Sequence, residues 1–178
     1  MRKAVFFDRD GIINEDFSYI YKPEDFRFMD GIFEFCHEAQ KKGYLLIIVT
    51  NQSGIARGYY TEEDFGRLND WMCHEFELRG ICINAVYYCP YHPEKGIGRY
   101  KRESADRKPS PGMLLKAIEK FDIVPDDSIM LGDRDSDMEA GRRAGIGRLV
   151  LMPGKYEYTP SDDVRVVRTF SEAEDYLY

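Results

Sequence analysis

Short apolar runs separated by helical patterns extend along most of the chain. Five of these runs are typical of strands buried on both faces, at residues 4–7, 44–49, 85–88, 129–131 and 148–152. Strands of a parallel sheet covered by helices are apolar throughout and do not alternate with polar residues. Helical patterns lie between most of the runs. The order of elements predicts an α/β fold with a doubly wound, Rossmann-like parallel sheet.

Three helix starts carry recognisable capping residues. Thr61 precedes three acidic residues, and the helical pattern that follows ends at Gly80. Ser110 is a candidate N-cap, with Pro111 at the first helical position. Ser136 with Glu139 three residues later has the spacing of a capping box.

Composition limits the class of protein. The chain has 178 residues, of which 43% are apolar and 32% charged, with a net charge of -7. We expect one soluble domain over residues 1–178 without a general nucleic-acid or membrane surface. No apolar run is long enough to span a membrane, and the N-terminal residues lack an apolar leader, so a cytoplasmic location is expected. The four cysteines show no paired spacing and are expected to be reduced thiols. No exposed apolar stripe is evident, which favours a monomer.

Two connections are long for a compact domain. They cover residues 8–30 and 89–110, and each begins where a predicted strand ends. Long loops at the carboxyl ends of parallel strands commonly bind ligands. Residues 95–108 hold six basic residues in an otherwise acidic chain, which favours an anionic ligand. We expect these loops to act as a minimal cap, with residues 89–110 recognising the substrate.

Polar residues gather at the predicted strand ends. The segments are Asp8-Arg9-Asp10-Gly11, Thr50-Asn51-Gln52-Ser53, Arg107-Lys108-Pro109, and Gly132-Asp133 with Asp135 and Asp137. In a parallel sheet these ends lie along one edge, so several carboxylates, a hydroxyl and a lysine should converge. Crowded carboxylates repel one another unless a cation lies between them, and an all-oxygen ligand set suits Mg²⁺.

The same residue types suit phosphoryl transfer. One aspartate can attack phosphorus, a second can protonate the leaving oxygen, and a cation and a lysine can neutralise the transferred group. We expect the neighbouring carboxylate to raise the pKa of the aspartate that acts as the acid. Strand alternation should turn Arg9 away from this chemistry. Asp135 and Asp137 fit either a helix N-terminus or the metal site.

These motifs resemble those of the haloacid dehalogenase-like phosphatases. "DRDG", the threonine of "VTNQSG", the lysine of "DRKP" and "GDRDSD" stand in the order of that superfamily's four motifs. The resemblance implies that Asp8 is the nucleophile and Asp10 the general acid and then base. It also implies that Thr50 and Lys108 hold the phosphoryl oxygens, and that Asp8, the main-chain carbonyl of Asp10 and Asp133 bind Mg²⁺.

Longer segments are similar to one family within that superfamily. "TNQSGIARG", "YYCPYHP" and "RKPSPGMLL" resemble the D-glycero-D-manno-heptose 1,7-bisphosphate 7-phosphatases. That family implies a sugar phosphate substrate and a place in the synthesis of activated heptose for bacterial surface polysaccharide. It also implies a set of substrate-binding residues, namely Asp16, Phe17, Ser18, Tyr19, Asn51, Gln52, Ser53, Arg107 and Arg134.

Two other functions share part of this pattern. The histidinol-phosphatases share the general plan but resemble "NQSGIARG" less well. Signalling receiver domains also place acidic residues, a threonine and a lysine around Mg²⁺. Their phosphorylated aspartate follows the third strand, where this chain has Tyr88-Cys89-Pro90.

The chain departs from its family in the long loop. Zinc-bearing members have a Cys-x-His pair and a later Cys-x-Cys, whereas this chain has Cys89-Pro90-Tyr91 and Ser104-Ala105-Asp106. A structural zinc normally takes four N or S ligands, and here Cys89 with the displaced His92 supplies two. We therefore expect a loop without zinc, held by packing of the tyrosines at 87, 88, 91 and 100.

Overall fold

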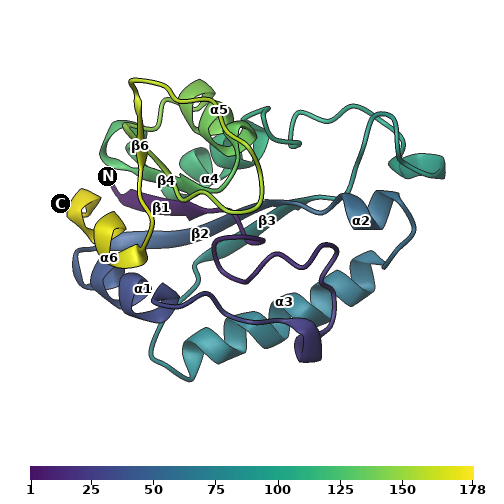
Figure 1. The fold of residues 1–178 in the computed structure, drawn as a ribbon, viewed down its shortest axis with the longest axis horizontal. Coiled ribbons are helices and arrows are strands. Elements are labelled where there is room, and N and C mark those ends of the chain that lie inside the picture. The colour runs from purple at the N-terminus through teal and green to yellow at the C-terminus, as the bar shows by residue number, and fades with distance from the viewer.

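A computed structural model describes residues 1–178, and it shows a six-stranded parallel sheet between two layers of helices (Figure 1). The strand order is β3-β2-β1-β4-β5-β6. The strands are β1 (Lys3–Phe7), β2 (Tyr44–Asn51), β3 (Ala85–Cys89), β4 (Ile129–Gly132), β5 (Arg148–Leu151) and β6 (Val164–Val166). The helices are α1 (Ile32–Lys41), α2 (Ser53–Ala56), α3 (Glu62–Glu77), α4 (Gly112–Phe121), α5 (Asp135–Arg143) and α6 (Phe170–Ala173). The predicted doubly wound α/β fold is confirmed.

Alternate residues of β1 pack into two separate hydrophobic cores, one on each face of the sheet. Val5 and Phe7 of β1 belong to the core beneath α1, α3 and α6, whereas Ala4 and Phe6 belong to the core beneath α4 and α5. Figure 1 shows these two groups of helices on opposite sides of the sheet. Burial on both faces explains why β1 is a continuous apolar run.

The predicted N-cap is confirmed for α3 but not for α4 or α5. Thr61 caps α3 as predicted, because its hydroxyl accepts the Asp64 N–H while the Asp64 carboxylate accepts the Thr61 N–H. The helix ends at Glu77, and Gly80 follows with a positive φ of 74°. At α4 the prediction is one residue early, because Pro111 is the N-cap and Gly112 the first helical residue.

The predicted capping box at Ser136 is wrong. Helix α5 begins at Asp135, and the carboxylate of Asp137 accepts the N–H groups of the two residues before the helix, Asp133 and Arg134. An anionic oxygen is the stronger acceptor at a helix N-terminus. The sixth strand, β6, is also absent from the sequence prediction because its three residues are partly exposed.

The carboxyl ends of β1, β2 and β4 are adjacent, since β1 pairs with β2 on one side and β4 on the other. The long connections after β1 and after β3 lie at this edge and contain only short 3₁₀ turns. No helix in the structure is long and apolar enough to cross a membrane.

Candidate active site

The edge formed by the ends of β1, β2 and β4 holds a buried group of charges. Asp8 follows β1, and Asp133 and Asp137 follow β4. Oxygen atoms from these three carboxylates lie within 4.8 Å of one another, and all three side chains are buried. The structure thus brings together the ends of segments that are 125 residues or more apart in the sequence.

Lys108 supplies the only ammonium group that contacts this cluster. Its Nζ donates to Asp8 Oδ1 at 3.0 Å, to Asp137 Oδ1 at 2.6 Å and to the Val49 carbonyl at 2.8 Å. All three ammonium protons therefore have acceptors, and the side chain is almost fully buried. Its pKa is raised: burial opposes the charge, but the carboxylates of Asp137 and Asp8 outweigh that cost. Lys108 stays charged.

Asn51 holds Lys108 in place. Its side-chain Nδ2 donates to the Lys108 carbonyl at 3.1 Å, and its Oδ1 accepts the Lys108 N–H at 3.0 Å. This two-point contact joins the end of β2 to the last residues of the long loop. Both polar atoms of the Asn51 side chain are therefore engaged by the protein, although the sequence predicts Asn51 as a substrate-binding residue.

Asp133 is the carboxylate without partners. Both of its side-chain oxygens are buried and accept no hydrogen bond. Burial, and then repulsion from Asp8 and Asp137, raises its pKa. The pKa of Asp8 is also raised, by burial and by the charge of Asp137, although the charge of Lys108 lowers it. Unpartnered buried oxygens among like charges are the donor set that a divalent cation satisfies.

Asp137 has a different role from Asp133. One of its oxygens accepts from Lys108, and the other accepts the backbone N–H groups of Asp133 and Arg134, each at 3.1 Å. Its hydrogen-bonding capacity is used within the protein, so it orients Lys108 and the start of α5. Asp135 lies outside the cluster and accepts the Thr159 N–H.

Gly11 allows the close approach of the first loop to Asp133. Its φ is +91°, and a Cβ at this position would lie 2.2 Å from Asp133 Oδ2. A side chain here would both strain the backbone and push the carboxylate aside. The glycine of "DRDG" is therefore required by the geometry of the cluster.

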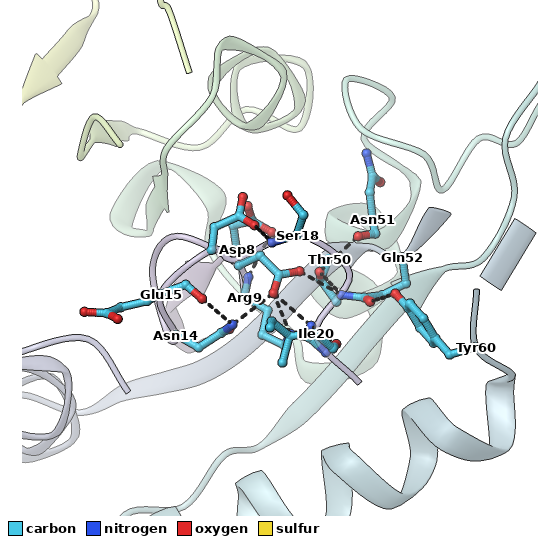
Figure 2. Close-up of polar contacts among 12 residues, drawn as sticks. Asp8, Arg9, Asn14, Glu15, Ser18, Ile20, Thr50, Asn51, Gln52 and Tyr60 are labelled. Carbon is cyan, nitrogen blue, oxygen red and sulfur yellow. Dashed lines mark hydrogen bonds and ion pairs between the residues drawn. The ribbon is translucent and has the colours of Figure 1, made fainter. Parts of the chain in front are cut away.

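The Asp10 carboxylate accepts hydrogen bonds from three side chains, those of Arg9, Asn14 and Gln52, which are labelled in Figure 2. Its Oδ1 accepts from Arg9 Nη2 at 2.8 Å and from Asn14 Nδ2 at 3.0 Å, and its Oδ2 accepts from Gln52 Nε2 at 3.2 Å. Burial opposes ionisation, but Arg9 and these donors outweigh it and lower the Asp10 pKa. The expectation that a neighbouring carboxylate raises the pKa of Asp10 is wrong: burial raises it, but the Arg9 charge and the hydrogen bonds from Arg9, Asn14 and Gln52 lower it by more.

Arg9 is buried beside the site. Residue 9 lies beyond the end of β1, so strand alternation does not apply to it. Its guanidinium donates to Asp10 and to the Ile20 carbonyl at 3.0 Å, and therefore connects the end of β1 to the loop that follows.

Above Asp8 lies a polar cavity of about 280 Å³. Most of the predicted substrate residues line it, as do Asp8, Asp10 and Lys108, whereas Thr50 and Asp133 lie buried beneath. The structure does not bring Phe17 to the cavity; its ring is exposed beside Arg27. The predicted substrate residues that line the cavity are Asp16, Ser18, Tyr19, Asn51, Gln52, Ser53, Arg107 and Arg134.

Three arginines on the cavity wall lack carboxylate partners. Arg57 has a buried Nε with no hydrogen-bond partner, and Arg107 donates only to the Tyr91 carbonyl at 3.4 Å. Arg134 lies over the Tyr156 ring at 3.5 Å. Burial, with repulsion from Arg134 and Arg57, lowers the Arg107 pKa. The cavity wall therefore carries positive charge that an anion could bind.

Two hydrogen bonds join the loops that carry Asp16 and Tyr156, which both line the cavity. Tyr156 donates to Asp16 Oδ2 at 3.1 Å, and Lys155 donates to Ser18 Oγ at 2.8 Å. The connection after β5 thereby meets the loop after β1. Sequence reasoning missed Arg57, Tyr60 and Tyr156 as cavity residues; Arg57 lies within "TNQSGIARG", but the two tyrosines carry no signal of their own.

Comparison with known proteins shows the relatives of this chain. A family model described as HAD-hydrolase-like matches residues 105–173. D-glycero-alpha-D-manno-heptose-1,7-bisphosphate 7-phosphatase of Burkholderia mallei is 53% identical over 150 residues, covering 84% of this chain and 79% of that protein. The corresponding enzyme for the beta anomer from Vibrio cholerae is 48% identical over 151 residues, covering 85% and 81%.

Solved structures show the same fold. The crystal structure of a putative HAD-like phosphatase from Mesorhizobium loti has a TM-score of 0.88 and 34% identity, covering 99% of this chain and 84% of that chain. D,D-heptose 1,7-bisphosphate phosphatase from B. bronchiseptica, complexed with magnesium and phosphate, has a TM-score of 0.81 and 24% identity, covering 97% and 96%. Because the identity with the curated relatives extends over most of both chains, this chain belongs to the D-glycero-D-manno-heptose 1,7-bisphosphate 7-phosphatase family of HAD-like phosphoric monoester hydrolases.

Proposed function

We propose that this protein is a Mg²⁺-dependent phosphatase that removes the 7-phosphate of D-glycero-D-manno-heptose 1,7-bisphosphate through an aspartyl phosphate on Asp8. The observation that carries the proposal is the position of Asp8 in a 280 Å³ polar cavity, where it contacts the buried ammonium of Lys108. Three arginines without carboxylate partners lie on the wall of the same cavity. The printed names of the relatives support the choice of substrate.

The reaction has two steps on this chain's own residues. In the first, Asp8 attacks the 7-phosphorus, the bond from phosphorus to the sugar oxygen breaks, and Asp10 gives that oxygen a proton. In the second, Asp10 takes a proton from water, the water oxygen bonds to phosphorus, and the Asp8–phosphorus bond breaks. The products are heptose 1-phosphate and inorganic phosphate. We assign the phosphoryl oxygens to Lys108, which would exchange a present acceptor for one of them, and to the Thr50 hydroxyl.

The carboxylate cluster fits a magnesium ion. Asp133, whose oxygens lack partners, would hold it with Asp8 and the main-chain carbonyl of Asp10. When bound, the ion would supply positive charge to the carboxylates and the phosphoryl oxygens. Asp137 is better suited to holding Lys108, because its oxygens already accept three hydrogen bonds.

A bisphosphate explains the cavity wall better than a monophosphate does. One phosphoryl group belongs at Asp8 and Lys108, which leaves Arg57, Arg107 and Arg134 without an anion. We assign these arginines to the 1-phosphate, because partly buried guanidinium groups favour a charged partner that accepts several hydrogen bonds. Residues 89–110 then serve as the substrate-recognition loop of a single domain over residues 1–178.

The loop at residues 89–110 fits a metal-free design. His92 Nδ1 accepts the N–H groups of Glu94 and Lys95 at 3.1 and 2.9 Å, and Asp106 pairs with Lys116 at 2.6 Å. With Cys89 buried near Tyr91, the three potential ligands do not form a cluster. The Tyr91 and Tyr100 rings pack at 6.1 Å. We infer that no zinc is bound; metal analysis of the purified protein tests this.

Glu62 also helps to hold this loop, whereas the sequence predicts that tyrosine packing alone stabilises it. The hydroxyls of Tyr88 on β3 and Tyr100 in the loop each donate to the Glu62 carboxylate at 2.7 Å, joining both segments to α3.

We further propose a cytoplasmic monomer, which light scattering of the purified protein and fractionation of cells would test.

The deciding assay measures phosphate release with Mg²⁺ from both anomers of the heptose bisphosphate, histidinol phosphate and p-nitrophenyl phosphate. We expect kcat/KM for one heptose anomer to exceed that for histidinol phosphate by at least about 100-fold, which is about 2.7 kcal/mol of transition-state discrimination. Relatives named for each anomer match almost equally well, so the assay also assigns the anomer. A flat profile, or a preference for histidinol phosphate, would contradict the proposed substrate.

A further inference from the structure

Tyr60 lies beside the site but has no place in the two-step reaction. It follows α2, its side chain is buried, and its ring stacks on Tyr21 with centroids 5.2 Å apart and planes 10° apart. A Cβ at Gly54 would lie 2.2 Å from the Tyr60 ring, so the glycine lets α2 approach the ring closely. The tyrosine is thus fixed on two sides by packing.

The hydroxyl of Tyr60 donates to the side-chain oxygen of Gln52 (Figure 2). The amide nitrogen of Gln52 donates in turn to Asp10 Oδ2 at 3.2 Å and to Thr50 Oγ1 at 2.9 Å. Gln52 is buried, and all its polar atoms have protein partners. The glutamine assigned to substrate binding from the sequence is therefore engaged by the catalytic groups.

The chemistry of the partners determines the orientation of the amide. When Asp10 is ionised, its carboxylate accepts hydrogen bonds and has none to donate, so the NH₂ end of Gln52 must face it. The oxygen end then faces Tyr60, which must donate. Without the tyrosine hydroxyl the buried amide oxygen would lack a partner, and the amide would no longer be held toward Asp10.

We propose that Tyr60 is a positioning residue that acts through Gln52 to orient the carboxylate of Asp10. This inference rests on the proposed acid and base role of Asp10. Arg9 and Asn14 hold Oδ1, whereas Gln52 is the only side chain that holds Oδ2. The Tyr60–Gln52 pair therefore fixes the position of Asp10 Oδ2.

The test uses Tyr60→Phe, which removes one oxygen and keeps the packed ring. The matched control is Tyr59→Phe, because Tyr59 is exposed and its hydroxyl has no hydrogen-bond partner in the structure. Both variants are assayed on the heptose bisphosphate and on p-nitrophenyl phosphate. A sugar alkoxide needs a proton to leave, whereas p-nitrophenolate leaves readily without one.

We expect Tyr60→Phe to lower both kcat and kcat/KM for the heptose bisphosphate about tenfold, with KM within twofold of the wild type. On p-nitrophenyl phosphate, kcat/KM should change less than twofold. Tyr59→Phe should match the wild type on both substrates. In a Gln52→Leu background, Tyr60→Phe should add less than a twofold loss, because the two residues act in series.

Equal losses on both substrates, or no loss on either, would overturn the proposal, as would a full additional loss in the Gln52→Leu background. Asp10→Asn separates this failure from failure of the proposed function. If Asp10→Asn keeps full activity on the heptose bisphosphate, the acid and base role of Asp10 itself is wrong. If Asp10→Asn is inactive but Tyr60→Phe is unaffected, only the role of Tyr60 is wrong.

Discussion

Replacing Lys108 with methionine should destabilise the protein strongly, because the buried carboxylates would lose their counter-charge. Methionine keeps the length and the packing of the side chain but removes three hydrogen bonds, of which two are to carboxylates. Removing one partner of a buried ion pair typically costs about 3 to 5 kcal/mol. Proton uptake by the neighbouring carboxylates limits the loss, so we expect a cost of about 4 kcal/mol.

Urea unfolding of the metal-free protein measures this cost. Trp71 is the single tryptophan and packs edge-on against Phe26 at 5.4 Å, so its fluorescence should report the loss of the core. The control is Lys116→Met, because Lys116 also pairs with an aspartate at 2.6 Å but is 59% exposed. Exposed pairs contribute about 0 to 1 kcal/mol. A cost below about 1 kcal/mol for Lys108→Met would refute the reasoning.

The charge argument also predicts how Mg²⁺ affects the variant. If Lys108 compensates the carboxylates, its loss leaves more uncompensated negative charge at the cluster. Added Mg²⁺ should therefore raise the melting temperature of Lys108→Met by more than it raises that of the wild type. Equal shifts would show that Lys108 and the cation do not act on the same charges.

Three further changes test other parts of the site. Asp133→Asn should stabilise the metal-free protein by about 2 kcal/mol at pH 7.5 and remove the thermal shift caused by Mg²⁺. The raised pKa of Asp133 means that the folded state keeps a proton that the unfolded chain releases, so the stability of the metal-free wild type should fall as pH rises above 3.8. In Asp133→Asn the fall should be less steep. Equal slopes of the free energy of urea unfolding against pH in the two proteins would contradict this. Gly11→Ala should lower kcat at least about 100-fold, because its Cβ displaces Asp133. The control is Gly43→Ala, where φ is +84° and a Cβ would meet no other atom. This control should lower the stability and leave kcat unchanged. Arg57→Leu should raise KM at least about tenfold for the bisphosphate and less than twofold for p-nitrophenyl phosphate, and equal changes would remove Arg57 from the 1-phosphate site.

The central strands β1 and β2 could be predicted because they are buried on both faces. Residues 4–7 and 44–49 are continuous apolar runs, and the structure extends these strands by only one or two residues. The strand β6 could not be predicted, since Val164-Arg165-Val166 is too short and too exposed to show a pattern. Its place in the sheet is set by pairing with β5.

The types of residue at the site were also readable, but their partners were not. The spacing of aspartates after two strands indicated that charges would converge. It could not show that Asn51 pairs with the backbone of Lys108, because that contact joins residues 57 apart along the chain. Nor could it show that Arg9 would be buried against Asp10, since the chain leaves the strand at Phe7 and the alternation rule ends there.

The central claim is that Asp8 carries the phosphoryl group during turnover. The most direct test is to stop the wild-type enzyme by rapid quench while it turns over heptose bisphosphate labelled in the 7-phosphate, and then to map the label on the chain. We expect label on the peptide that contains Asp8, and neither label nor turnover in Asp8→Asn. Full turnover without labelled Asp8, or an active Asp8→Asn variant, would contradict the account.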